Sequence, residues 1–194
     1  MIWAIKKNER TKSVPFDRAK CPLCNKEVIA KCGEIKIWHW AHKSNFECDS
    51  FGESESDWHI KWKENFPKEH QEVLIQKNKG LEIHRADIKT KSGTIIELQN
   101  SPISSKQIKK REEFYGEKMI WILNGKTFGK NIIFYKQRFK WKWFPKSWEV
   151  SERRIYIDLG KIYLMYLNIV GPTGMFIKFS KIAFIIEHGG NPFK

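Results

Sequence analysis

The chain has 194 residues, of which 41% are hydrophobic, which is enough for one ordinary domain and a small additional module. Its 36 Lys and Arg residues outnumber its 22 Asp and Glu residues, and the net charge of +14 favours a polyanionic partner, nucleic acid before an anionic membrane surface. The first residues are too short an apolar run for a signal peptide, and no later segment reaches the roughly 18 apolar residues that span a bilayer, so we expect a cytoplasmic protein without a membrane partner.

All four cysteines lie in the stretch from Cys21 to Cys48. In a reducing compartment, cysteines crowded in this way bind metal more often than they form disulfides. Residues 1–50 are also poor in aliphatic side chains, a composition that usually needs a metal to become ordered. We therefore expect residues 1–50 to form a zinc-binding module.

The candidate zinc ligands are two closely spaced pairs, Cys21 with Cys24 and His39 with His42. Thiolates and imidazoles at such spacings can close a tetrahedral structural site, which leaves no open position for a substrate. The histidines are closer together than in a usual zinc finger. Cys48 is therefore an alternative to one histidine, and Cys32 is a weaker alternative.

Residues 51–124 form the second region, and its first predicted element is a helix from Glu53 to about Phe66. Glu55, His59 and Lys63 recur every four residues and so form one polar stripe on this helix. Trp58 and Trp62 form the neighbouring stripe, which we expect to be buried. Position alone favours a solvated helix face over a functional site for the polar stripe.

Two strand-like runs, 84–90 and 94–99, surround Lys91-Ser92-Gly93, where Gly93 can adopt the left-handed conformation of a three-residue hairpin loop. This register places Asp87 opposite Glu97, with their Cβ atoms roughly 5 Å apart, and Gln99 on the same face. Opposed carboxylates repel each other, a cost that a bound Mg²⁺ or Mn²⁺ offsets. The alternative is a solvated face on which both acids pair with lysines.

The next predicted elements are a helix and a buried strand. Ser101-Pro102 resembles an N-cap followed by proline at the first helical position, and the helix is expected to run to about Tyr115, where Gly116 ends it. Met119 to Leu123 then predicts a buried strand. Together they indicate a strand–helix–strand crossover.

Residues 125–194 are aromatic and β-rich, with predicted strands at 131–135 and 154–158. The run Arg138 to Phe144 alternates cations with aromatic residues, which suits either a nucleic-acid surface with stacking rings or a half-buried strand. We favour the strand, with three rings in the core and the cations in water, where they can still contact phosphate. The core rings are then Phe139, Trp141 and Trp143, and the exposed cations are Arg138, Lys140 and Lys142.

The order of these motifs resembles the competence protein CoiA family over most of residues 1–124. The resemblance rests on Cys-Pro-x-Cys at 21–24, His-Trp-Ala-His at 39–42, Glu-Ser-x-x-His at 55–59 with Lys63, Arg-Ala-Asp-Ile at 85–88, Glu-Leu-Gln-Asn-Ser-Pro-Ile-Ser at 97–104, Arg111, Tyr115 and Trp-Ile-Leu at 121–123. It implies an α/β fold with a PD-(D/E)XK restriction-endonuclease-like core over 51–194, behind the zinc-finger-like module, and a β-rich C-terminal part.

The resemblance also implies a metal-dependent DNA nuclease that acts in DNA processing or recombination during natural transformation. Asp87 and Glu97 occupy the positions that bind the catalytic Mg²⁺ or Mn²⁺, and Glu55 fills the place of an assisting carboxylate. Gln99 replaces the usual lysine, so it is expected to orient the attacking water, while Lys63 or His59 supplies the missing cation. Expected nucleic-acid contacts are Arg85, Ser101, Ser104, Arg111, Lys140 and Lys142.

The expected partners are DNA, single-stranded or branched, and recombination proteins. Two other functions suit the same sequence. One is a non-catalytic DNA-binding adaptor on a nuclease scaffold, and the other is a nuclease of a phage, a mobile element or a defence system.

Overall fold

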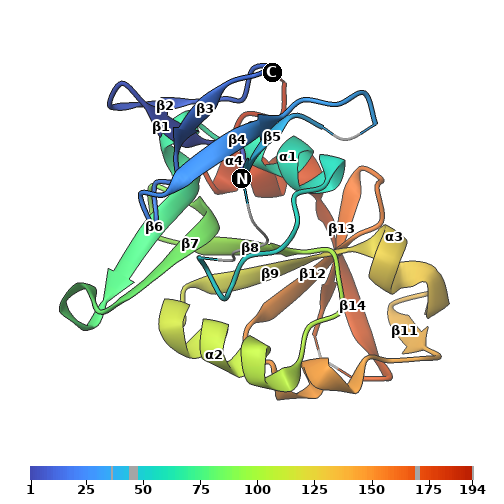
Figure 1. Cartoon of the computed structure of the whole chain (residues 1–194). Coiled ribbons are helices and arrows are strands. Elements are labelled where there is room, and N and C mark those ends of the chain that lie inside the picture. Colours follow the sequence, from blue (N-terminus) through green and yellow to red (C-terminus); the bar gives the residue numbers. More distant parts are fainter. Residues whose placement is uncertain (36, 44–47, 169–170, 194) are drawn as a thin grey trace.

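A computed structural model describes residues 1–35, 37–43, 48–168 and 171–193 (Figure 1). Its smaller sheet has the strand order β2-β1-β3-β4-β5. These strands are β1 (Ala4–Lys6), β2 (Glu9–Thr11), β3 (Arg18–Lys20), β4 (Glu27–Lys31) and β5 (His39–His42).

The larger sheet has the order β10-β11-β14-β13-β12-β9-β8-β7-β6, in which β9 pairs parallel with both β8 and β12. Its strands are β6 (Gln71–Lys77), β7 (Glu82–Lys89), β8 (Ile95–Gln99), β9 (Met119–Asn124), β10 (Ile132–Tyr135), β11 (Arg138–Trp141), β12 (Arg154–Asp158), β13 (Tyr163–Leu167) and β14 (Thr173–Ser180). The helices are α1 (Asp57–Glu64), α2 (Ser105–Tyr115), α3 (Gly125–Phe128) and α4 (Lys181–Glu187), with short 3-10 turns at Lys68–His70, Asn78–Gly80, Gly129–Asn131 and Lys146–Val150. The fold is therefore mixed α/β.

Both faces of the larger sheet are covered, as expected for its parallel central strands. Figure 1 shows α2 on one side of the sheet and α1 and α4 on the other. Alternate residues of β9 accordingly enter two different cores: Trp121 packs on the α2 side, and Ile120 packs with Trp62 and Phe184 on the opposite side. Among the described residues, no helix is long and apolar enough to cross a membrane.

Hydrogen bonds join the smaller sheet to strand β6. The indole Nε1 of Trp3 donates to Gln71 Oε1 at 2.9 Å, and the backbone N–H of Ile2 donates to Glu72 Oε1 at 2.8 Å. All four residues are buried. The edge of the larger sheet thus carries the N-terminal module.

The hairpin register expected from the sequence is confirmed. Strands β7 and β8 pair Ile88 with Ile96, which puts Asp87 opposite Glu97. Gly93 has the predicted left-handed conformation, with φ +83°. The strands predicted at 131–135 and 154–158 are also present, as Ile132–Tyr135 and Arg154–Asp158.

Three predicted details are wrong at the ends of elements. Helix α1 begins at Asp57 rather than Glu53, because Ser56 caps it by accepting a hydrogen bond from the backbone N–H of His59. Helix α2 is capped by Ser104 rather than Ser101, although it ends at Tyr115 as expected. Strand β11 ends at Trp141, so Trp143 lies beyond the strand and is 66% exposed instead of in the core.

Asp158 fixes both helices of one face to the sheet. Its buried Oδ2 accepts hydrogen bonds from the indole N–H of Trp58 at 3.0 Å and that of Trp62 at 2.7 Å. The ammonium of Lys181, the first residue of α4, lies 2.8 Å from the same oxygen. Burial alone raises the pKa of Asp158, but its bond to Lys181 and its other partners hold the pKa below the ordinary value.

We expect Asp158→Asn to lower the free energy of unfolding at pH 7 by about 2–3 kcal/mol, since it leaves buried donors with a weaker acceptor. A lowered folded-state pKa stabilises the fold above the ordinary pKa of aspartate, and this stabilisation is lost as the pH falls through the folded value. Denaturant unfolding from neutral to about pH 3 should therefore show parent and variant converging in acid. Asp57→Asn, at an exposed position, is the control. Parallel curves would contradict this assignment.

Candidate active site and candidate metal centre

Four ligand atoms gather where the smaller sheet meets the following segment. They belong to Cys21, Cys24, His42 and Cys48, and all lie within 4.8 Å of one another. The Sγ atoms of Cys21 and Cys48 are 3.7 Å apart, and Cys24 Sγ is 3.2 Å from His42 Nε2. Sulfurs bound tetrahedrally at about 2.3 Å from zinc are about 3.8 Å apart. The group could therefore bind a metal such as zinc.

His39 does not belong to this group, which corrects the ligand set expected from the sequence. His39 and His42 are the two ends of β5, and residues three apart on a strand point to opposite faces. The Nδ1–H of His39 donates instead to the Ile37 carbonyl at 2.8 Å. Cys48, the alternative ligand, takes the fourth place, and Cys32 also lies outside the group.

The thiols of the group lie too close together to ionise without a nearby positive charge. Burial, together with the neighbouring thiols of Cys21 and Cys24, raises the pKa of Cys48 to about 12. A metal ion reverses this effect because it stabilises the thiolate directly. The soft donor set and its charge preference thus both fit zinc.

Asp87 and Glu97 form the second cluster, on the β7–β8 hairpin. The backbone N–H of Asp87 donates to Glu97 Oε1 at 3.2 Å, and that of Leu98 donates to Asp87 Oδ2 at 3.0 Å. Each carboxylate is thus fixed by the opposite strand. Since an ionised carboxylate accepts about four hydrogen bonds, both retain capacity for a further ligand.

The pKa values of the two carboxyl groups are shifted in opposite directions. Burial and the charge of Asp87 raise the pKa of Glu97 to about 8. Burial alone raises the pKa of Asp87 too, but the ammonium of Lys63 and the ring of His59 hold it below the ordinary value. The pair therefore resists carrying two negative charges unless more positive charge is present.

Lys63 reaches this cluster from α1. Its Nζ lies 2.9 Å from Asp87 Oδ1, 2.8 Å from Glu55 Oε1 and 3.1 Å from Glu72 Oε1. The side chain is only 1% exposed, so the stripe of Glu55, His59 and Lys63 is not the solvated face that its position favoured. Glu72, on β6, had no signal in the sequence that linked it to this site.

His59 lies beside Lys63 and completes the inner face of α1. Its Nε2 is 3.3 Å from the Leu98 carbonyl and 3.4 Å from Glu53 Oε2. Burial alone lowers the pKa of His59, but Glu53 and Asp87 outweigh burial and raise it. Glu53, which the sequence analysis did not select, is held by the Asn100 backbone N–H at 3.1 Å.

A cavity of about 20 Å³ lies between these side chains, room for one water molecule or one ion. Glu53 Oε1 and Glu55 Oε2 are buried without a hydrogen-bond partner among the described residues. Buried acceptors of this kind usually hold water or a cation. The cavity is lined by Phe51, Gly52, Glu53, Glu55, His59, Arg85, Asp87, Glu97, Leu98 and Arg111.

Gln99 and Arg111 support Glu97 from behind. Arg111 Nη1 is 3.3 Å from both Glu97 Oε2 and Gln99 Oε1, and its Nη2 donates to the Phe51 carbonyl at 2.6 Å. Gln99 Nε2 donates to the Ser101 carbonyl at 2.9 Å. Gln99 does not line the cavity, whereas the buried Arg111 does. The role of Gln99 in orienting water and the contact of Arg111 with DNA stay predictions.

The other expected nucleic-acid contacts are dispersed. Arg85 is half-buried and lines the cavity, while Ser104 lies exposed at the start of α2. Lys140 and Lys142 are exposed on and just after β11, and strands β14, β13, β12 and β9 separate β11 from β8. The structure therefore does not bring these lysines to the carboxylate cluster.

Comparison with known families matches both parts of the chain. Residues 5–51 match the family described as Competence protein CoiA, N-terminal domain, and residues 57–170 match Competence protein CoiA, nuclease-like domain. Comparisons with curated proteins and with solved structures found no match. Since the nuclease-like match alone spans more than half of the chain, the resemblance seen in the motifs is confirmed. The chain belongs to the competence protein CoiA family.

Proposed function

We propose that this chain is a metal-dependent DNA nuclease of the PD-(D/E)XK type that processes DNA during natural transformation. The observation that carries the proposal is the pair of Asp87 and Glu97, opposed on a hairpin at a small polar cavity. The nuclease-like family match and the net charge of +14 support it.

The donors at this cavity fit Mg²⁺ or Mn²⁺. Asp87 and Glu97 would hold the ion through hard carboxylate oxygens, and the unpartnered Glu55 Oε2 supplies a further acceptor. When bound, such an ion polarises a phosphodiester oxygen and lowers the pKa of an attacking water.

The residues around the pair give it the charge and geometry that the reaction needs. Lys63 keeps Asp87 ionised, and so takes over part of the role of the lysine that Gln99 replaces. His59 lines the cavity beside the Leu98 carbonyl, where its ring can orient a water molecule. Arg111 holds the Glu97 carboxylate in place.

Binding of Mn²⁺ tests the ion site without requiring turnover. In titrations followed by electron paramagnetic resonance of free Mn²⁺, the zinc-loaded parent should bind one Mn²⁺ ion per chain. Asp87→Asn and Glu97→Gln should each weaken this binding at least about tenfold, because each removes a charged ligand. An absence of Mn²⁺ binding by the parent, or variants that bind Mn²⁺ as tightly as the parent does, would refute the assigned site.

We expect Lys63→Met to lower the free energy of unfolding by about 3–5 kcal/mol, since it leaves buried carboxylates without their cation. Lys61→Met is the matched control, because Lys61 lies exposed on the same helix. Denaturant unfolding of both variants at neutral pH measures the difference. Equal stability of the two would show that Lys63 does not neutralise the cluster.

A non-catalytic DNA-binding adaptor is the second candidate function. It is favoured by the ion pairs of Asp87 with Lys63 and of Glu97 with Arg111, which compensate both carboxylates within the chain. An adaptor should bind DNA in a salt-sensitive manner and keep this binding after both Asp87 and Glu97 are replaced by alanine.

A further inference from the structure

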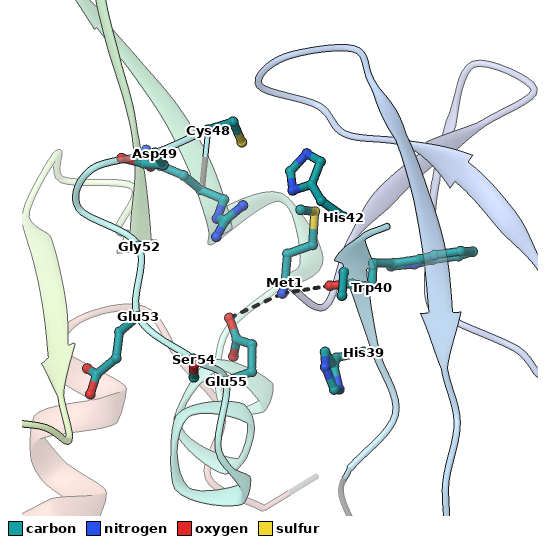
Figure 2. A pocket seen from close by; sticks show the side chains of 12 residues that line it. Met1, His39, Trp40, His42, Cys48, Asp49, Gly52, Glu53, Ser54 and Glu55 are labelled. Carbon is teal, nitrogen blue, oxygen red and sulfur yellow. Dashed lines mark hydrogen bonds and ion pairs between the residues drawn. The ribbon is translucent and has the colours of Figure 1, made fainter. Parts of the chain in front are cut away.

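A second and larger pocket lies between the N-terminal module and the candidate active site. Figure 2 shows the segment from Cys48 to Glu55 along one wall, and β5 with Met1 along the other. The pocket has a volume of about 240 Å³. Neither part of the chain forms it alone.

The pocket borders the small cavity at the carboxylate pair. The residues that line both are Gly52, Glu53, Glu55 and Arg85. The pocket and the cavity therefore share a wall, so that a nucleotide in the pocket would lie next to the carboxylates. The volume of the pocket is about twelve times that of the small cavity, and it suits one nucleotide of a single strand rather than a duplex.

The pocket wall carries the guanidinium of Arg85 and three acidic residues, Asp49, Glu53 and Glu55. Four of the six carboxylate oxygens have partners, and the two that have none among the described residues are Glu53 Oε1 and Glu55 Oε2. Asp49 is occupied by the His84 ring at 2.7 Å and by the Arg85 backbone N–H at 2.8 Å. Glu55 Oε1 is paired with Lys63. The guanidinium of Arg85 stays charged, because the surrounding carboxylates outweigh burial and raise its pKa. Its planar donors match a phosphate group.

His39 adds an aromatic ring to the pocket wall contributed by β5. His39 and His42 both line the pocket, but only His42 belongs to the metal group, so His39 is available to a ligand. Single-stranded nucleic acids are bound largely by stacking of bases on aromatic rings, including histidine, beside cations that contact the backbone.

We propose that this pocket binds the nucleotide next to the scissile phosphate of a single-stranded DNA, with Arg85 at its phosphate and His39 against its base. This inference rests on the proposed nuclease function and deepens it. It makes the N-terminal module part of the substrate site, and it gives His39 a role that is independent of zinc.

Two variants test the pocket without touching the carboxylate pair. Ser54→Leu adds bulk from an exposed residue of the pocket wall, and His39→Ala removes the ring. Ser50→Leu is the matched control, because Ser50 is exposed on the same segment but lines neither cavity. Fluorescence anisotropy with a labelled single strand of about eight nucleotides, without added Mg²⁺ or Mn²⁺, measures binding, and elemental analysis measures zinc.

We expect Ser54→Leu and His39→Ala to bind the strand about tenfold more weakly than the parent, the size expected for losing one stacked base. Ser50→Leu should bind like the parent, and all three variants should keep their zinc. With Mg²⁺ or Mn²⁺ added, His39→Ala should raise KM and leave kcat within about twofold, as for a residue that binds substrate without reacting.

Equal binding by Ser54→Leu, His39→Ala and Ser50→Leu would overturn the pocket proposal, whether or not the parent cuts DNA. Loss of zinc from His39→Ala would overturn it as well, since His39 would then be a metal ligand. A parent that binds the strand through this pocket but cuts no DNA would instead contradict the nuclease function and leave the pocket supported.

Discussion

Replacing Asp87 by asparagine should lower the rate of metal-dependent DNA cleavage by about a thousandfold. The substitution removes a charged ligand of the ion and the partner of Lys63. The ion would then be bound weakly, and its positive charge would no longer stabilise the transition state. Glu97→Gln should have an effect of similar size, because its carboxylate lies directly opposite. Single-turnover cleavage of labelled DNA with excess enzyme measures the chemical step.

Asp57→Asn is the control for this loss of activity, because it removes the same charge at an exposed position on α1. It should cut within about twofold of the parent. Far-ultraviolet circular dichroism of each variant separates a lost reaction from a lost fold. Cleavage by folded Asp87→Asn within tenfold of the parent would show that this carboxylate does not carry the reaction.

Replacing Cys48 by serine should remove the metal from the N-terminal module and unfold its small sheet. Zinc binding contributes about 10–16 kcal/mol in small zinc-ordered peptides, so the loss of one of four ligands should lower stability by several kcal/mol. The buried core of the module is small and consists of Ala4, Ala19, Cys21, Val28 and Trp40, which offers little compensation. Elemental analysis and thermal unfolding measure both effects.

Cys32→Ser is the matched control for Cys48→Ser, because Cys32 lies outside the four-atom group. It should keep about one zinc per chain and unfold at the parent's temperature. His39→Ala should also keep its zinc. The reverse pattern, with zinc retained in Cys48→Ser and lost from His39→Ala, would contradict the ligand set.

Local sequence signals predicted the carboxylate hairpin well. Gly93 set the loop, and strand alternation then determined that Asp87 faces Glu97. Gly116 likewise marked the end of α2. These features depend on conformational preferences of a few neighbouring residues, which a single sequence contains.

Features that depend on packing between distant segments were not predictable in this way. The polar stripe of α1 is buried because Asp87 and Glu72, from two strands, surround Lys63. Glu53 joins the site only because the segment before α1 crosses the end of β8, where Asn100 binds it. Helical spacing alone cannot distinguish such a buried stripe from a solvated one.

The zinc ligands were also not fully predictable from the sequence, because their choice depends on the local secondary structure. The spacing of His39 and His42 suits one turn of helix, but these residues form a strand, which separates their rings. Cys48 then reaches the group from the segment that leads into the nuclease-like domain. All four ligands thus lie within the N-terminal match, residues 5–51, although Cys48 comes from outside the smaller sheet.

Cleavage of a panel of labelled single-stranded, duplex and branched DNA, with Mg²⁺ or Mn²⁺, is the most direct test of the proposed nuclease. The zinc-loaded parent is compared with the double variant Asp87→Ala, Glu97→Ala at equal concentration. The parent should cut at least one substrate only when the divalent ion is present, and the double variant should cut none of them measurably. A parent that cuts no substrate with either ion, or a double variant that cuts as well as the parent, would contradict the proposed nuclease.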